Sequence, residues 1–213
     1  MEENSIFLFP QIKTNNPNVV YEIGLNHHGL ILAIKGNEKI IFADKLVFNS
    51  IENLLKKNKK NVKIKEMEKF ETFLKKEKEK DVYLDFSNTS LSFYMKIKKI
   101  AKKVKNCSLI WLEKRAKKNE KEIKKLKKAS NIAKSVIDYL KENTEKIKEH
   151  ISEEKIRMLI IEYFAKNDVY ESFPSIVASG KRSAYPHHMP TKKTCKELLL
   201  IDRGCIYEHY CSD

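Results

Sequence analysis

The chain has 213 residues, 41% of them hydrophobic, so it can form one large or two small domains with a hydrophobic core. Its formal net charge of +14 is typical of nucleic-acid-binding proteins, but only four of its 43 basic residues are arginines. Arginine is the residue that reads phosphates and guanines. We therefore expect a solvated lysine surface, of a kind also found in heat-adapted proteomes, rather than a nucleic-acid-binding face.

Neither the amino terminus nor the cysteines indicate export. The first ten residues carry Glu2 and Glu3 in place of a basic signal region, and no apolar run approaches the length of a membrane span. The four cysteines form no CxxC pair, so we expect reduced, mostly buried thiols. These features favour a cytoplasmic protein without a membrane partner.

Short β-rich runs alternate with lysine-rich amphipathic runs in the first half, which predicts an α/β domain over residues 1–116. The predicted strands are residues 19–21, 30–34, 39–42, 82–86 and 109–111, and the predicted helices are residues 51–57, 70–76 and 94–104. His27 and His28 have no further metal ligands nearby, so we interpret them as part of a solvated turn.

A shift to lysine-rich sequence at Glu113 marks a second domain, residues 117–213. Apolar residues from Ile123 to Leu140 recur at the spacing of one buried helix face, so we expect a long helix that begins at Glu113. A second helix should follow, with Ser152 as its N-cap and Glu153 in its first turn, where a carboxylate stabilises the helix dipole.

Two aspartates near the end of the chain are candidate metal ligands. Residues 173–180 read as a strand, and residues 198–202 and 206–213 read as a hairpin. Asp202 and Asp213 are 11 positions apart, so a hairpin centred on Tyr207 and Glu208 would place them directly opposite, about 4.5–5.5 Å apart at Cβ. Two carboxylates so close repel each other unless cations lie between them, and oxygen donors select ions such as Mn²⁺ or Mg²⁺. The alternative is a turn-capping Asp202 and a solvated Asp213.

The motifs of this domain resemble those of the Xaa-Pro aminopeptidase and prolidase metallopeptidases, which share the pita-bread fold. The motifs occur in the family's order, and they are residues 113–118 with 122–123, residue 173 with 176–180, residues 186–187, and residues 201–204 with 210–213. The resemblance implies an α/β N-terminal domain like that of creatinase and prolidase, followed by the first half of an α+β pita-bread catalytic domain that is incomplete at its C-terminus.

The resemblance implies that Asp202 and Asp213 are the first two metal ligands. It also implies that His187 is a catalytic residue that contacts the substrate and stabilises the intermediate, whereas His188 is a loop histidine. The family adds one histidine and two glutamates, which complete a site for two Mn, Co or Zn ions. Two positions depart from the pattern, because Arg203 replaces an apolar residue and His209 replaces a turn glycine, although histidine tolerates positive φ better than most residues.

From these residues we expect the N-terminal part of a Xaa-Pro metallopeptidase that needs a separate C-terminal half and is inactive alone. Its expected partners are that complementary half or a second copy of the chain, and a peptide with proline in the second position. The alternative is a non-catalytic member of the family that binds peptides or proteins, and a weaker one is a lysine-rich nucleic-acid-binding protein.

Overall fold

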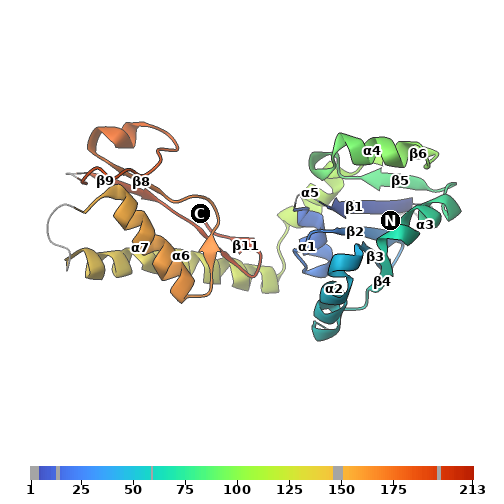
Figure 1. Cartoon of the computed structure of the whole chain (residues 1–213), viewed down its shortest axis with the longest axis horizontal. Helices are drawn as coiled ribbons and strands as arrows, with labels where there is room; N and C mark the ends of the chain where they lie inside the picture. Colours follow the sequence, from blue (N-terminus) through green and yellow to red (C-terminus); the bar gives the residue numbers. More distant parts are fainter. Residues whose placement is uncertain (1–4, 13–14, 59, 146–150, 196–197) are drawn as a thin grey trace. The chain divides into compact units, whose positions relative to one another are not determined.

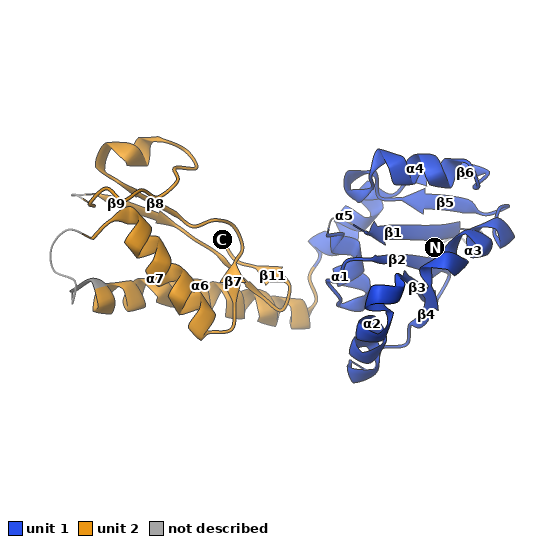
Figure 2. Ribbon diagram, viewed as in Figure 1, with its two compact units in different colours: residues 1–117 blue, residues 118–213 orange. Residues whose placement is uncertain are grey.

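The computed structural model describes residues 5–12, 15–58, 60–145, 151–195 and 198–213. The chain divides into two compact units, residues 1–117 and residues 118–213, which Figure 2 colours separately. The predicted division lay one residue earlier. Each unit has its own hydrophobic core.

Unit 1 is built on a six-stranded sheet of order β4-β3-β2-β1-β5-β6 (Figure 1). β2 runs antiparallel to β1 and β3, and the other neighbouring strands are parallel. β1 is buried along its whole length because both faces of the sheet are covered. The strands are β1 (Ser5–Gln11), β2 (Leu30–Lys35), β3 (Glu38–Ala43), β4 (Lys63–Glu66), β5 (Asp81–Leu84) and β6 (Lys103–Asn106).

Helices cover both faces of this sheet and form a three-layer α/β/α domain, which confirms the predicted class. One face packs against α1, α2 and α5 around the buried Trp111, and the other packs against α3 and α4 around Phe70 and Phe93. The helices are α1 (Pro17–Ile23), α2 (Lys45–Lys57), α3 (Phe70–Lys76), α4 (Leu91–Lys98) and α5 (Ser108–Ala116), with 3-10 turns η1 (Met67–Lys69) and η2 (Phe86–Asn88).

The prediction of a strand at residues 19–21 was wrong, because these residues lie in α1. The Asn16 side chain caps this helix by accepting a hydrogen bond from the amide of Asn18 at 3.1 Å, and Pro17 occupies the first turn. These start signals outweigh the β propensity of the two valines that follow.

The carboxyl-terminal part of unit 1 also differs from its prediction. Residues 109–111 lie in α5, where Trp111 is buried while Leu109 is 71% exposed, and an apolar run of three residues does not distinguish a strand from a helix. The predicted helix 94–104 is α4, which begins at Leu91 and ends at Lys98, followed by the strand β6. The central strand β1 was missed in the sequence.

Unit 2 packs two helices against short antiparallel strands (Figure 1). Its core contains Ala129 and Val136 from one helix, Phe164 from the other, and Val177 and Cys205 from the strands. The elements are α6 (Glu120–Glu145), α7 (Glu153–Lys166), β7 (Tyr170–Glu171), β8 (Ile176–Ser179), η3 (Gly180–Ala184), β9 (Leu199–Asp202), β10 (Cys205–Tyr207) and β11 (Tyr210–Cys211). The strands form a three-stranded sheet of order β11-β10-β7 and a separate pair, β8 and β9.

Side-chain caps set the beginnings of both long helices. α6 begins at Glu120 and not at Glu113, because Asn119 and Glu122 form a reciprocal capping box with hydrogen bonds of 2.9 and 3.1 Å. α7 begins as predicted, since the Ser152 hydroxyl accepts a hydrogen bond from the amide of Lys155 at 3.2 Å.

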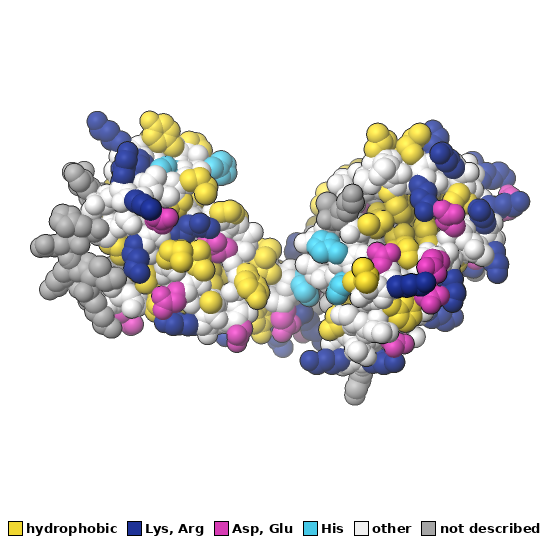
Figure 3. All heavy atoms as spheres, in the orientation of Figure 1, with side chains coloured by type: hydrophobic (Ala, Val, Ile, Leu, Met, Phe, Trp, Pro, Cys, Tyr) yellow, Lys and Arg dark blue, Asp and Glu magenta, His cyan; other side chains and the backbone are white. Residues whose placement is uncertain are grey.

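The cysteines are free thiols, and the expected burial holds for Cys107 and Cys205, whereas Cys195 is half-buried and Cys211 is exposed. Burial raises the pKa of Cys107 to about 12. On the face shown in Figure 3, lysine and arginine side chains are interspersed with acidic ones in both units. Within the described part of the chain, no helix has the length and apolar character needed to cross a bilayer.

Candidate functional site

The strands that carry the two aspartates do not pair with each other as predicted. β9 pairs with β8, so Asp202 lies opposite Ile176, and β10 pairs with both β7 and β11. The hairpin is therefore β10–β11 alone, and the strand that ends at Asp202 belongs to a different sheet.

The register of the β10–β11 hairpin also differs from the prediction. Tyr207 pairs with Tyr210, so the turn consists of Glu208 and His209, one position later than expected. Both turn residues have positive φ, 44° and 74°, as a two-residue type I′ turn requires, so His209 does adopt the conformation usual for glycine. Continuing this register outward places Asp213 opposite Gly204 and not opposite Asp202.

A close backbone contact nevertheless joins the segments that carry the two aspartates. A Cβ atom on Gly204 would lie 2.0 Å from the Ser212 carbonyl oxygen and 2.3 Å from the Ser172 hydroxyl, so only glycine fits. The Ser172 hydroxyl donates a hydrogen bond to the Ser212 carbonyl at 2.9 Å. Asp202 and Asp213 therefore flank one tight crossing of the chain, and both side chains are exposed.

Two contacts from α6 fix the ends of these strands. The Tyr210 hydroxyl donates to the Glu122 carboxylate at 3.0 Å, so the residue that caps α6 also holds the hairpin. Arg203, which departs from the family pattern, donates from Nε to the Ala133 carbonyl at 3.0 Å. The Cys205 thiol also donates to the Ala129 carbonyl at 3.3 Å, and Lys125 pairs with Glu208 at 2.9 Å, so α6 holds the segment between the aspartates at several points.

The described residues hold no group of three or more His, Cys, Asp or Glu side chains arranged to bind a metal ion. The two aspartates are chemically suited to a hard divalent cation, because carboxylate oxygens are the donors that Mn²⁺ and Mg²⁺ prefer. They supply two donors, whereas catalytic metal sites usually have at least three protein ligands. Within the ranges that the structure describes, the two aspartates are thus a pair of candidate donors and not a complete ligand set.

His187 lies in the segment between η3 and β9, before the strands that carry the two aspartates. Its side chain is exposed, and its backbone has φ 54°, a left-handed conformation that few non-glycine residues adopt. His188 lies in the same loop, as interpreted above, and its Nε2 lies 3.0 Å from Oε2 of the buried Glu153.

Glu153 is the centre of a buried hydrogen-bond network in unit 2. Its side chain is fully buried at the first residue of α7. Oε1 accepts from the amide of Ser179 at 2.8 Å and from Nε of Arg182 at 2.7 Å. Oε2 accepts from the amide and hydroxyl of Thr191 at 3.1 and 2.8 Å, besides the contact with His188.

The network keeps this carboxylate ionised. Burial alone would raise the pKa of Glu153, but the hydrogen bonds from His188, Arg182, Thr191 and Ser179 outweigh it and lower the pKa to about 2. An ionised carboxylate only accepts hydrogen bonds, so Nε2 of His188 carries a proton in this contact.

Sequence reasoning missed this role of Glu153. Its place in the first turn of a helix is explained by the helix dipole, and its partners lie 26 to 38 positions away. The sequence near Glu153 carries no signal that separates a buried network from an exposed first-turn glutamate.

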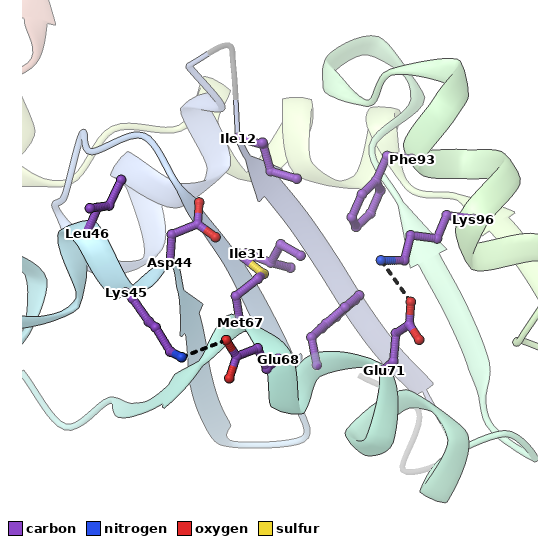
Figure 4. Close-up of a pocket in the computed structure, with 11 residues that line it drawn as sticks. Ile12, Ile31, Asp44, Lys45, Leu46, Met67, Glu68, Glu71, Phe93 and Lys96 are labelled. Carbon is purple, nitrogen blue, oxygen red and sulfur yellow. Dashed lines mark ion pairs between the residues drawn. The ribbon is translucent and has the colours of Figure 1, made fainter.

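Unit 1 contains a cleft of about 590 Å³ (Figure 4). Its wall includes Ile31 and Asp44, and four further charged side chains form two ion pairs, Lys45 with Glu68 at 3.0 Å and Lys96 with Glu71 at 2.9 Å. The lining contains no histidine or cysteine.

Comparison with known sequences points to one family. Residues 124–213 match the model of metallopeptidase family M24. The chain is 32% identical over 222 residues to the Xaa-Pro dipeptidase of Pyrococcus horikoshii, a match that covers 100% of this chain and 60% of that protein. A stretch of 98 residues is 39% identical to an uncharacterized peptidase of Methanocaldococcus jannaschii, over 45% of this chain and 28% of that protein.

Solved structures extend the similarity to both units. The X-Pro aminopeptidase of Thermotoga maritima matches with a TM-score of 0.83 at 26% identity, covering 98% of this chain and 60% of that one. The prolidase of Pyrococcus horikoshii matches with a TM-score of 0.81 at 26% identity, covering 98% of this chain and 58% of that one. The chain thus spans less than two thirds of the length of each of these relatives.

Proposed function

We propose that the chain supplies two metal-binding carboxylates and a substrate-contacting histidine to a peptidase of metallopeptidase family M24, whose model matches residues 124–213, and that this peptidase cleaves Xaa-Pro peptides. Its fold is an α/β N-terminal domain followed by part of the pita-bread catalytic domain. The observation that carries the proposal is the 32% identity to a Xaa-Pro dipeptidase along the whole chain.

In this proposal Asp202 and Asp213 hold divalent ions of the Mn²⁺ or Co²⁺ type, which carboxylates suit. A bound divalent ion would polarise the peptide carbonyl and lower the pKa of water so that it attacks at neutral pH. The tight crossing at Gly204 supports this assignment, because it fixes the backbone beside both aspartates.

His187 has a separate role in the proposal. Its imidazole N–H would donate a hydrogen bond to the oxygen that becomes negatively charged when the peptide bond is attacked. Its exposure leaves this side chain open to a substrate. Exposed Tyr185 and Met189 flank it and offer apolar surface to the proline ring.

We further propose that the missing ligands come from outside residues 1–213, on the same polypeptide or on a separate one. β9 pairs only with β8 among the described strands, and Leu199 and Leu200 on it are 37% and 41% exposed. An exposed strand edge with apolar side chains is a surface that another strand can cover. The remainder of the catalytic domain is the proposed partner of this edge.

The test is to combine residues 1–213 with the rest of a family catalytic domain and assay cleavage of Xaa-Pro peptides with Mn²⁺ or Co²⁺. We expect metal-dependent cleavage by the assembled protein and none by residues 1–213 alone. Metal-independent cleavage, or cleavage by residues 1–213 alone, would contradict the proposal. Peptide binding without turnover in an assembled, metal-loaded protein would favour a non-catalytic, peptide-binding member of the family.

A further inference from the structure

The hydrogen bonds to Glu153 span the whole loop that carries His187. Ser179 ends the strand before this loop, Arg182 lies in η3, and Thr191 lies beyond His188. One carboxylate therefore binds the beginning, the middle and the end of a segment of the chain.

The backbone of α7 binds the far end of the same loop. The amide of Glu154 donates to the Thr191 carbonyl at 3.0 Å, and the amide of Glu153 donates to the Lys193 carbonyl at 3.3 Å. Arg182, which binds Glu153 through Nε, also donates a hydrogen bond from Nη2 to the Thr194 carbonyl at 3.3 Å. The loop is thus fastened around the first residue of one helix.

Helix capping does not account for the burial of Glu153. Ser152 already accepts the hydrogen bond from the first turn of α7, and the donors to the Glu153 carboxylate named above all lie outside α7. A first-turn glutamate that only interacted with the helix dipole would gain as much at the surface, as Glu154 shows by its exposure.

His187 needs such support. A left-handed backbone costs a non-glycine residue about 1–2 kcal/mol, so the conformation persists only where neighbouring contacts impose it. The next residue, His188, is bound to Glu153, and this contact fixes the direction of the chain immediately after His187.

We propose that Glu153 is a positioning residue, which holds the loop of residues 179–191 so that His187 faces the substrate. The reference to substrate rests on the proposed function, whereas the anchoring of the loop does not. Glu153 would not touch the reacting atoms. It would act through His188, Arg182 and Thr191 on the placement of His187.

The physical test compares Glu153→Gln with Glu154→Gln in residues 1–213 by amide hydrogen exchange. Both variants lose one carboxylate from the first turn of α7, but only the Glu153 carboxylate accepts hydrogen bonds from the loop, whereas Glu154 contacts it through its backbone amide. We expect exchange at the Ser179 and Thr191 amides to accelerate at least ten-fold in Glu153→Gln, with displaced imidazole NMR signals of His187. Glu154→Gln should match the wild type in both readouts.

Exchange rates in Glu153→Gln within about two-fold of the wild type would overturn the proposal. If Glu153→Gln does not fold, Thr191→Val is the second variant. It keeps the Glu153 carboxylate and the approximate size of residue 191, and it removes only the hydroxyl that donates to Glu153. It should accelerate exchange in the same loop by a smaller factor, and an unchanged loop in Thr191→Val would equally count against the anchoring role.

A double-mutant cycle in the assembled peptidase separates positioning from general structural damage. Glu153→Gln should lower kcat at least ten-fold with unchanged metal content, and the double variant with His187→Ala should be no slower than His187→Ala alone. If the two substitutions lowered kcat by independent factors that multiply in the double variant, Glu153 would not act through His187. Absence of turnover in the wild-type assembly would reject the proposed function, while the exchange result would still decide the anchoring.

Discussion

Replacing Glu153 with glutamine should destabilise unit 2 and leave unit 1 unaffected. Glutamine has nearly the size of glutamate, so the change opens no large cavity. It removes the negative charge and turns one acceptor oxygen into an NH₂ group, which would face the donors of Ser179 and Arg182 or those of His188 and Thr191. Buried donors would then lose their acceptor.

The size of the effect follows from the lowered pKa. A glutamate with a usual pKa of 4.5 in the unfolded chain and about 2 in the folded one contributes about 3 kcal/mol to folding at neutral pH. Removing one partner of a buried ion pair costs about 3–5 kcal/mol, which agrees with this value. We therefore expect Glu153→Gln to lower the unfolding free energy of unit 2 by about 3 kcal/mol.

The assay is urea unfolding followed by two signals. Trp111, the one tryptophan in the chain, is buried in unit 1 and reports that unit by fluorescence. Far-ultraviolet circular dichroism also follows α6 and α7. In Glu153→Gln the unit 2 transition should move to lower urea by roughly 1–3 M, while the Trp111 transition stays in place. Glu154→Gln is the matched control and should shift neither.

The pH dependence supplies a second check with a definite sign. Because the folded pKa of Glu153 is lowered, its contribution is fully present above pH 4.5 and declines as the pH falls toward 2. The difference in unfolding free energy between wild type and Glu153→Gln should be constant from pH 7 to about 5 and shrink below that. A difference under about 1 kcal/mol at pH 7, or one that grows in acid, would refute this reasoning.

Three further changes test the C-terminal strands. Gly204→Ala should destabilise unit 2 by about 2–3 kcal/mol in the same assay, because its Cβ would lie 2.0 Å from the Ser212 carbonyl oxygen; an unchanged midpoint would contradict the crossing. His209→Gly should stabilise unit 2 by about 1 kcal/mol because φ is 74° there, and a loss of stability would argue against the type I′ turn. Leu200→Lys should reduce any self-association of residues 1–213 seen by sedimentation, because charge blocks an exposed edge strand; equal association in both proteins would exclude this edge.

Elements with local signals in the sequence were predicted well. The periodic apolar face of α6 and the Ser152 cap of α7 are set by residues close in the sequence, and both are found in the structure. The α/β alternation of unit 1 likewise gave the right class, although the short apolar run at residues 109–111 did not specify its own conformation and became a helix through packing of Trp111.

The site was harder to predict because its geometry depends on distant contacts. The turn at Glu208 and His209 lacks the Asn-Gly pattern that marks a type I′ hairpin, so the register was placed one residue early. The pairing of β9 with β8 joins residues that are 20 to 26 positions apart. Glu153 shows the same limit, because its partners lie at the end of β8 and in the segment that follows it, beyond α7 and β7.

The central claim is that Asp202 and Asp213 hold metal while His187 acts on the substrate. Metal content and Xaa-Pro peptide turnover, measured together on the assembled peptidase, test it most directly. Asp202→Asn and Asp213→Asn should lose bound metal and turnover, whereas His187→Ala should keep its metal and slow turnover by about 10²–10³. An Asp202→Asn enzyme with full metal content and a near-normal rate would contradict the account.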